Sequence, residues 1–157
     1  MRDRLRLLRN DESGVALVEF ALVLPLLLLL LFGMLDFGKA FNYWIDETHL
    51  ANEGARLAAV NYQPPGGQSL VAYIKSQADT AELRNGGTTS VATPGATVCV
   101  SFPSGTSNVG DPVRVSTTIQ YNLLPFIGGR IGTANVRLTS TSTMRLEAVP
   151  SYAAGCS

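Results

Sequence analysis

The chain has 157 residues, with 12 basic and 12 acidic side chains and a formal net charge of zero. This length allows one domain with an anchor and excludes two full domains. The balanced charge disfavours a general nucleic-acid binder, which normally presents a basic face, so we expect no nucleic-acid partner. The apolar residues are concentrated near the N-terminus, and the remainder is polar and rich in Thr, Ser and Gly.

The concentrated apolar segment covers residues 15–35 and contains six consecutive leucines at 26–31. As a helix rising about 1.5 Å per residue it would span roughly 30 Å, the thickness of the hydrocarbon core of a bilayer. Four arginines precede the segment and only Lys39 follows it closely, which places the N-terminus in the cytoplasm. We therefore predict a single-pass protein of the cytoplasmic membrane, in contact with membrane lipid, whose C-terminal part is extracytoplasmic.

A cleaved secretory signal peptide is the alternative explanation of this segment. Gly38 and Ala40 form a small-x-small pair, but they follow Asp36 and Phe37 in a stretch that still has helical character. We favour the retained anchor.

The start of the apolar segment combines a glycine with a carboxylate. Gly14 stands just before the segment, and Glu19 followed by Phe20 stands inside it. A carboxylate in hydrocarbon costs on the order of 2.5–3.5 kcal/mol, so Glu19 needs a partner. Cleavage after Gly14 would create an α-amino group on Val15, four residues before Glu19 and on the same helix face. The alternative is that Glu19 only lies at the membrane surface.

This arrangement resembles the cleavage site of type IVb prepilins: a glycine, four residues, then Glu and Phe at the opening of a long apolar helix. The wider sequence resembles the TadE-like family over about residues 9–60. The residues that carry this resemblance are the block at 14–25, the leucines behind it, the segment 36–39 and the element at 51–58.

The resemblance implies processing by a prepilin peptidase at the inner face of the membrane. The residues that it assigns to this processing are Gly14, Val15, Glu19 and Phe20. It also implies a role in the tight-adherence (Flp) type IVb pilus system, with other pilin-like subunits and pilus-assembly proteins as partners. Flp-type main pilins are essentially a helix alone, so the resemblance favours a minor pseudopilin, in the membrane or in a surface filament.

Helical periodicity continues beyond the apolar segment and predicts one helix from about residue 15 to about residue 60, bent near Pro25. A heptad-like stripe comprises Phe37, Phe41, Trp44, Thr48, Ala51, Ala55 and Ala58. We expect its distal half to pack on the protein's own domain and its membrane-proximal half to contact neighbouring subunits. Tyr43 and Trp44 are expected near the lipid headgroups.

The C-terminal part predicts a second helix over about residues 70–83, followed by sequence of period two. Three short strands are expected, and a helix must cover the buried face of their antiparallel sheet. The strands are predicted at 97–102, 112–124 and 135–147, with loops at 103–111 and 125–133. The fold class is therefore α+β, with a long N-terminal transmembrane helix and a small antiparallel sheet, as in pilins.

These elements divide the chain into four parts. We predict a cytoplasmic leader peptide at 1–14, a transmembrane helix at 15–37, a helical stalk at 38–62 and an extracytoplasmic α+β domain at 63–157.

Cys99 and Cys156 both follow the membrane segment, and an oxidising compartment allows one disulfide between them. Two unrelated thiols are the alternative. His49 and Glu53 have the spacing of a ligand pair on a helix, but two ligands do not make a metal site. The sequence offers no catalytic constellation, so we expect a non-enzymatic protein without cofactor or metal. The alternative to the pseudopilin is a membrane-anchored extracytoplasmic binding module that is neither cleaved nor incorporated into a filament.

Overall fold

The structure is a computed structural model that describes residues 11–123 and 134–157. Most of the predicted leader and the predicted loop at 125–133 lie outside these residues. The chain divides into two compact units, Met1–Phe37 and Gly38–Ser157.

Helix α1, Asp11–Ala59, is the longest element and continues through Pro25. The helix begins four residues before the predicted start near residue 15. The bend at Pro25 stays a prediction.

Within the first unit, the leucines of α1 other than the half-buried Leu24 are exposed, at 38–75% of their surface. The helix is long and apolar enough to cross a membrane, and none of its most apolar window is buried in the protein. Exposed apolar surface of this extent needs a cover of lipid or of other helices.

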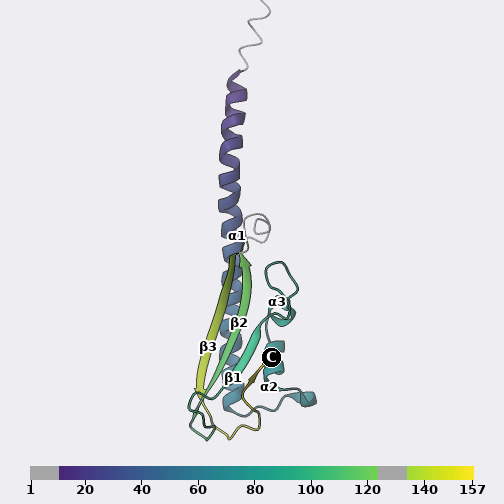
Figure 1. Ribbon diagram of the computed structural model, residues 1–157, viewed down its shortest axis with the longest axis vertical. Helices are drawn as coiled ribbons and strands as arrows, with labels where there is room; N and C mark the ends of the chain where they lie inside the picture. Colours follow the sequence, from purple (N-terminus) through teal and green to yellow (C-terminus); the bar gives the residue numbers. More distant parts are fainter. Residues whose placement is uncertain (1–10, 124–133) are drawn as a thin grey trace, which may run out of the picture. The chain divides into compact units, whose positions relative to one another are not determined.

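The second unit contains a four-stranded antiparallel sheet in the order β3-β2-β1-β4 (Figure 1). Its strands are β1, Thr97–Ser101; β2, Pro112–Leu123; β3, Ala134–Arg145; and β4, Gly155–Cys156. The α+β fold is thereby confirmed. The sequence did not predict β4, because two residues are too few to show a period-two pattern.

The predicted helix at 70–83 is wrong, because the structure has two helices there, α2, Leu70–Ser76, and α3, Ala81–Asn85. A 3-10 turn, Pro65–Gly67, precedes them. The break follows from a contact with α1, whose Asp46 carboxylate accepts hydrogen bonds from the backbone N–H groups of Asp79 and Thr80 at 3.1 and 2.9 Å. In a continuous helix, these two N–H groups would instead donate to backbone carbonyls of the helix. Thr80 is the N-cap of α3, because its side-chain hydroxyl accepts a hydrogen bond from the backbone N–H of Leu83.

The core lies between the inner face of the sheet and the helices, and strands β1–β3 run alongside the distal half of α1 in Figure 1. On β2, inward and outward residues alternate, so that every second side chain is buried. The buried residues of the sheet and of the helices form one cluster, which includes Leu50, Ala55, Ala58, Leu70, Ile74, Leu83, Val98, Val100, Val113, Val115, Ile119 and Tyr121.

At Gly54, α1 packs closely against α2 and β2. A Cβ atom at this position would lie 3.0 Å from Cγ2 of Ile74 and 3.1 Å from Cγ1 of Val115. Ala51, Ala55 and Ala58 on the same side of α1 are buried as well. These small residues allow α2 and β2 to pack directly on the helix backbone.

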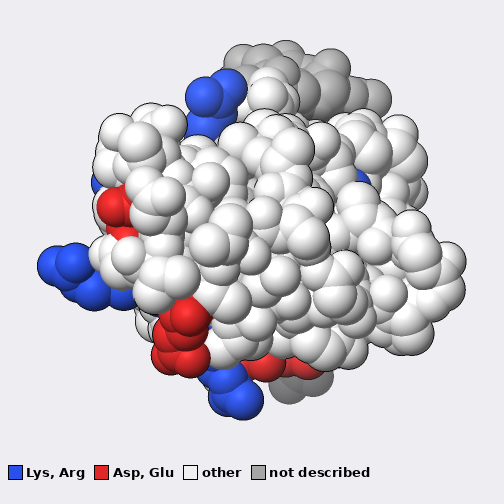
Figure 2. Space-filling view, turned by 90° about the horizontal axis from the view of Figure 1, so that it is seen from below, with Lys and Arg blue, Asp and Glu red and all other residues white. Residues whose placement is uncertain are grey.

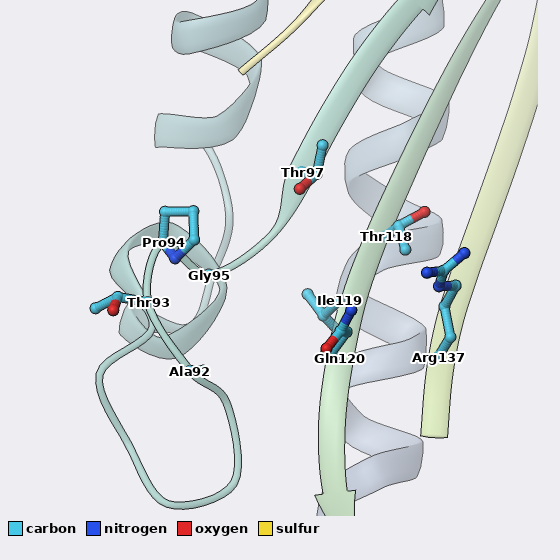
Figure 3. A pocket seen from close by; sticks show the side chains of 9 residues that line it. All are labelled: Ala92, Thr93, Pro94, Gly95, Thr97, Thr118, Ile119, Gln120 and Arg137. Carbon is cyan, nitrogen blue, oxygen red and sulfur yellow. The ribbon is translucent and has the colours of Figure 1, made fainter. Parts of the chain in front are cut away.

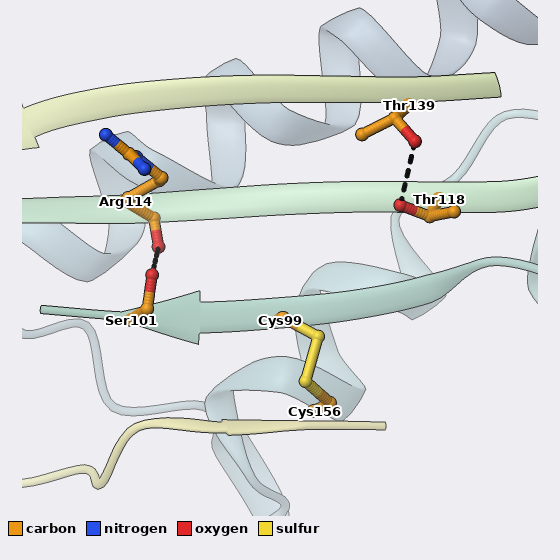
Figure 4. The surroundings of a disulfide bond; sticks show 6 residues. All are labelled: Cys99, Ser101, Arg114, Thr118, Thr139 and Cys156. Atoms are coloured by element: carbon orange, nitrogen blue, oxygen red, sulfur yellow. Dashed lines mark hydrogen bonds between the residues drawn. A yellow bond between two sulfur atoms is a disulfide. The ribbon is translucent and has the colours of Figure 1, made fainter. Parts of the chain in front are cut away.

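Cys99 and Cys156 form a disulfide, with their Cα atoms 4.1 Å apart (Figure 4). The two residues are opposite each other in the pairing of β1 with β4, so the bond ties the C-terminal strand to the sheet. Ser157 extends this pairing, since its N–H donates to the carbonyl of Val98 at 3.0 Å.

Enlarging Gly54 should separate α1 from α2 and β2. We expect Gly54→Val to destabilise the folded domain by about 1–3 kcal/mol, the usual cost of overpacking a filled core. Gly38→Val is the matched control, because a Cβ at Gly38 finds no atom within 4 Å. Chemical unfolding of the detergent-solubilised chain measures both, and equal losses of stability would contradict this account.

Removing the disulfide should lower stability without changing the fold. The two cysteines are 57 residues apart, and closing a loop of this length contributes at most about 4 kcal/mol in the chain-entropy model. We expect the double variant Cys99→Ser with Cys156→Ser to unfold at lower denaturant concentration than the oxidised protein. Reductant should bring the unaltered protein to the same midpoint, and a midpoint insensitive to reductant would argue against the bond.

Candidate functional site

The four residues predicted for processing lie in the first turns of α1, and their side chains are exposed. Val15 is 57% exposed and Phe20 is 58% exposed. Val15 and Glu19 are one helical turn apart, so an amine on Val15 and the Glu19 carboxylate lie on the same side of the helix. Nothing in the described residues lies within 4 Å of a Cβ placed on Gly14.

The bond between Gly14 and Val15 lies inside α1, because the helix begins at Asp11. Proteases generally act on extended backbone, so cleavage at this bond would require this end of the helix to open locally. Glycine makes opening easier, since it costs about 1 kcal/mol in a helix relative to alanine. The glycine at the predicted cut therefore lowers the free energy needed to open the first turns of the helix.

The predicted stripe along α1 divides into two parts in the second unit. Ala51, Ala55 and Ala58 are buried in the domain core, as expected for the distal half. Phe41 and Trp44 are 49% and 45% exposed, so the described part of the protein's own domain leaves almost half of each side chain uncovered.

Tyr43, predicted near the headgroups, is instead buried within the second unit. Its ring packs on Tyr121 with the ring centres 5.6 Å apart. Burial, together with the nearby Glu82 carboxylate, raises the pKa of its hydroxyl. Tyr43 and Trp44 are adjacent in sequence and point to different sides of α1, which a prediction from residue type alone could not separate.

Glu47 is an acidic side chain that the sequence analysis did not single out. It is completely buried between α1 and β2, and within the described residues neither of its carboxyl oxygens has a hydrogen-bond partner. Its backbone carbonyl accepts a hydrogen bond from Thr117 at 3.1 Å. Burial raises the pKa of Glu47 from 4.5 to about 8, and repulsion from Asp46 adds to this rise. The backbone amide of Ile119 lowers the pKa and partly opposes the rise, although its geometry is not that of a hydrogen bond. Glu47 is therefore predominantly protonated at neutral pH.

A pocket of about 450 Å³ lies beside β2, opposite the loop of residues 92–95 (Figure 3). Arg137 is its one charged residue, and the hydroxyl groups come from Thr93, Thr97 and Thr118. None of the residues that line it carries a carboxylate, imidazole or thiol, so the pocket itself supplies hydrogen bonds and no general base.

The charges seen in Figure 2 lie mainly at the margin of the view and include both signs. This face therefore offers no broad patch of one sign. His49 is exposed, and no group of three His, Cys, Asp or Glu side chains in the described part of the chain is arranged to hold a metal ion.

Comparison with known proteins connects part of this chain to a family. Residues 14–56 match the sequence model of the family described as TadE-like protein, which confirms the resemblance noted above. The match begins at Gly14 and covers the apolar helix and the small residues around Gly54. Searches of curated proteins and of solved structures found no match.

The buried Glu47 predicts how stability depends on pH. Because its folded-state pKa is raised, its contribution to stability is complete below pH 4.5 and is lost as pH rises toward about 8, at up to about 1.4 kcal/mol per pH unit. We expect Glu47→Gln, which cannot ionise, to flatten this part of the profile and to raise stability at pH 8.

Glu53→Gln is the control, since Glu53 is half exposed and lies 3.9 Å from Arg56 on the surface. It should leave the pH profile unchanged. Thermal unfolding of the three proteins from pH 5 to pH 8 makes the comparison, and parallel profiles for Glu47→Gln and the unaltered protein would show that Glu47 does not titrate in this range.

Proposed function

We propose that this protein is a minor pseudopilin of a tight-adherence (Flp) pilus system, anchored in the cytoplasmic membrane and processed by a prepilin peptidase. The observation that carries the proposal is the TadE-like match, which begins at Gly14 and includes Glu19 and the entire apolar segment. The family suggests a protein associated with the Tad pilus. The exposed leucines of α1 and the folded domain behind them support a subunit that combines an anchor with a displayed domain.

In the proposed mechanism the leader keeps the N-terminus in the cytoplasm, where the peptidase cuts between Gly14 and Val15. The new α-amino group of Val15 then pairs with Glu19 of the same chain or of a neighbouring subunit. This pairing lowers the cost of placing a carboxylate in the membrane and sets the axial position of neighbouring helices. The extracytoplasmic domain acts through contacts with other pilin-like subunits and assembly proteins, and no catalytic role is assigned to it.

Cleavage can be tested by producing the chain in its native host or together with a prepilin peptidase. We expect the recovered protein to begin at Val15 by N-terminal sequencing. Gly14→Leu should remain in the membrane uncut, because the larger side chain obstructs approach to the backbone and stabilises the helix. Gly33→Leu is the matched control, since Gly33 lies on the same helix with open space around it, and this variant should be cut.

Assembly is tested separately with Glu19. We expect Glu19→Ala and Glu19→Gln to be cut and to assemble poorly, because neither can pair with the Val15 amine. An N-terminus at Met1, or anywhere beyond Asp36, would contradict the pseudopilin mechanism. The first result would favour the uncleaved anchored module, and the second would favour a secreted domain.

A further inference from the structure

The outer side of α1 is largely apolar at the start of the second unit, where Asn42 is its one exposed polar residue between Phe41 and Ile45, and it is polar from His49 to Arg56. Phe41, Trp44 and Ile45 are exposed at 49%, 45% and 47%, and we call these three residues the outer aromatic surface. The rings of Phe41 and Trp44 contact each other, with their centres 5.7 Å apart. The same side of the helix continues with residues that are polar or charged and exposed, namely His49, Asn52, Glu53 and Arg56.

Within the described residues, about half of each side chain of the outer aromatic surface is left uncovered. The sheet packs against the opposite side of α1, where Glu47, Leu50 and Ala51 are at most 3% exposed. Three large apolar side chains that are each almost half exposed on one helix face form a patch that requires a cover.

The position of this patch in the chain indicates which cover it has. Phe41 follows Leu35, the last residue of the apolar segment, by six residues, and Ile45 follows it by ten. In a helix ten residues rise about 15 Å, so the patch cannot be far from the outer boundary of the bilayer. A bilayer has a headgroup layer several ångströms thick on each side of its hydrocarbon core, and Trp residues are enriched there.

We propose that the outer aromatic surface of Phe41, Trp44 and Ile45 binds the lipid headgroup layer on the extracytoplasmic side. This inference rests on the membrane anchoring contained in the proposed function and not on cleavage after Gly14. It explains why large apolar side chains prevail on this side up to Ile45 and polar side chains prevail from His49 to Arg56, since the turn between them is where water replaces lipid. If another helix covered this side of α1 along its full length, the exposed residues would not need to differ in polarity before and after the turn between Ile45 and His49.

The surface has a consequence for the domain. In this proposal, three side chains hold the first turns of α1 in the second unit in contact with the headgroup layer. The inner side of the same turns carries Tyr43, Asp46 and Glu47, which belong to the domain, so the lipid contact and the domain share one short stretch of helix.

Trp44 provides the test, because it is the one tryptophan in the chain. The full-length protein is reconstituted at a low protein-to-lipid ratio in vesicles of phosphatidylethanolamine and phosphatidylglycerol, and flotation establishes that it is anchored. We expect Trp44 emission to be shifted to the blue and to be quenched by lipids brominated close to the glycerol. Acrylamide in the aqueous phase should quench it weakly.

The control moves the reporter five residues further along α1, past Ile45, by combining Trp44→Phe with His49→Trp. A tryptophan at 49 should emit as a water-exposed residue and should be quenched by acrylamide and not by the brominated lipids. The pair Phe41→Ser and Ile45→Ser, with Trp44 retained, should float normally and lose the lipid quenching. Gly14→Leu should behave as the unaltered protein, so a failure of the cleavage proposal leaves this result unaffected.

Three outcomes would overturn the inference. Trp44 that is quenched by acrylamide as strongly as the tryptophan at 49 would show a surface in water. A blue shift that appears only at high protein-to-lipid ratio, without quenching by brominated lipid, would assign the surface to a second copy of the chain. A protein that does not float would contradict the anchoring and this inference together.

Discussion

The close approach of α1 to β2 and α2 is the contact on which the domain depends. It is possible because Gly54 has no side chain and because Ala51, Ala55 and Ala58 continue the same narrow strip. With larger residues the helix would be held away from the sheet, and the inward side chains of β2 would lose the cover that buries them. Ala51, Gly54 and Ala55 of this strip lie at the end of the segment that matches the TadE-like family.

A single helix therefore serves two surroundings that require different surfaces. In the first unit α1 exposes leucine on all sides, as a helix surrounded by apolar material must. In the second unit one side is reduced to glycine and alanine for the sheet, and the other carries aromatic residues that end after one turn. Glu47 shows how tightly the inner side is closed, since a carboxyl group sits there without a hydrogen-bond partner in the described structure and is kept neutral by its burial.

The elements that the sequence predicted well are those with a long and regular pattern. The apolar helix, the two long strands and the distal burial of Ala51 to Ala58 follow from hydrophobic periodicity, which is strong over ten residues or more. The break between α2 and α3 could not be predicted, because it depends on Asp46, a residue more than thirty positions earlier that takes the backbone donors of Asp79 and Thr80. The burial of Glu47 was missed for a similar reason, since nothing local separates it from the exposed acidic residues of the helix. The processing residues were found from their pattern, and their position in the first turns of α1 is compatible with that assignment without testing it.

The C-terminal strand also determines how the sheet meets other chains. An unpaired strand edge is a template on which further strands can add, and proteins usually cover or charge it. Here the edge of β1 is closed at Cys99 and Val100 by β4, and the disulfide prevents this short strand from fraying. The opposite edge is the twelve-residue strand β3, which carries Arg137 and Arg145 and no acidic residue. Two like charges along that edge disfavour pairing between the β3 strands of two identical domains. Where many of these domains are close together, edge-to-edge aggregation is therefore opposed by the disulfide at one edge of the sheet and by charge repulsion at the other.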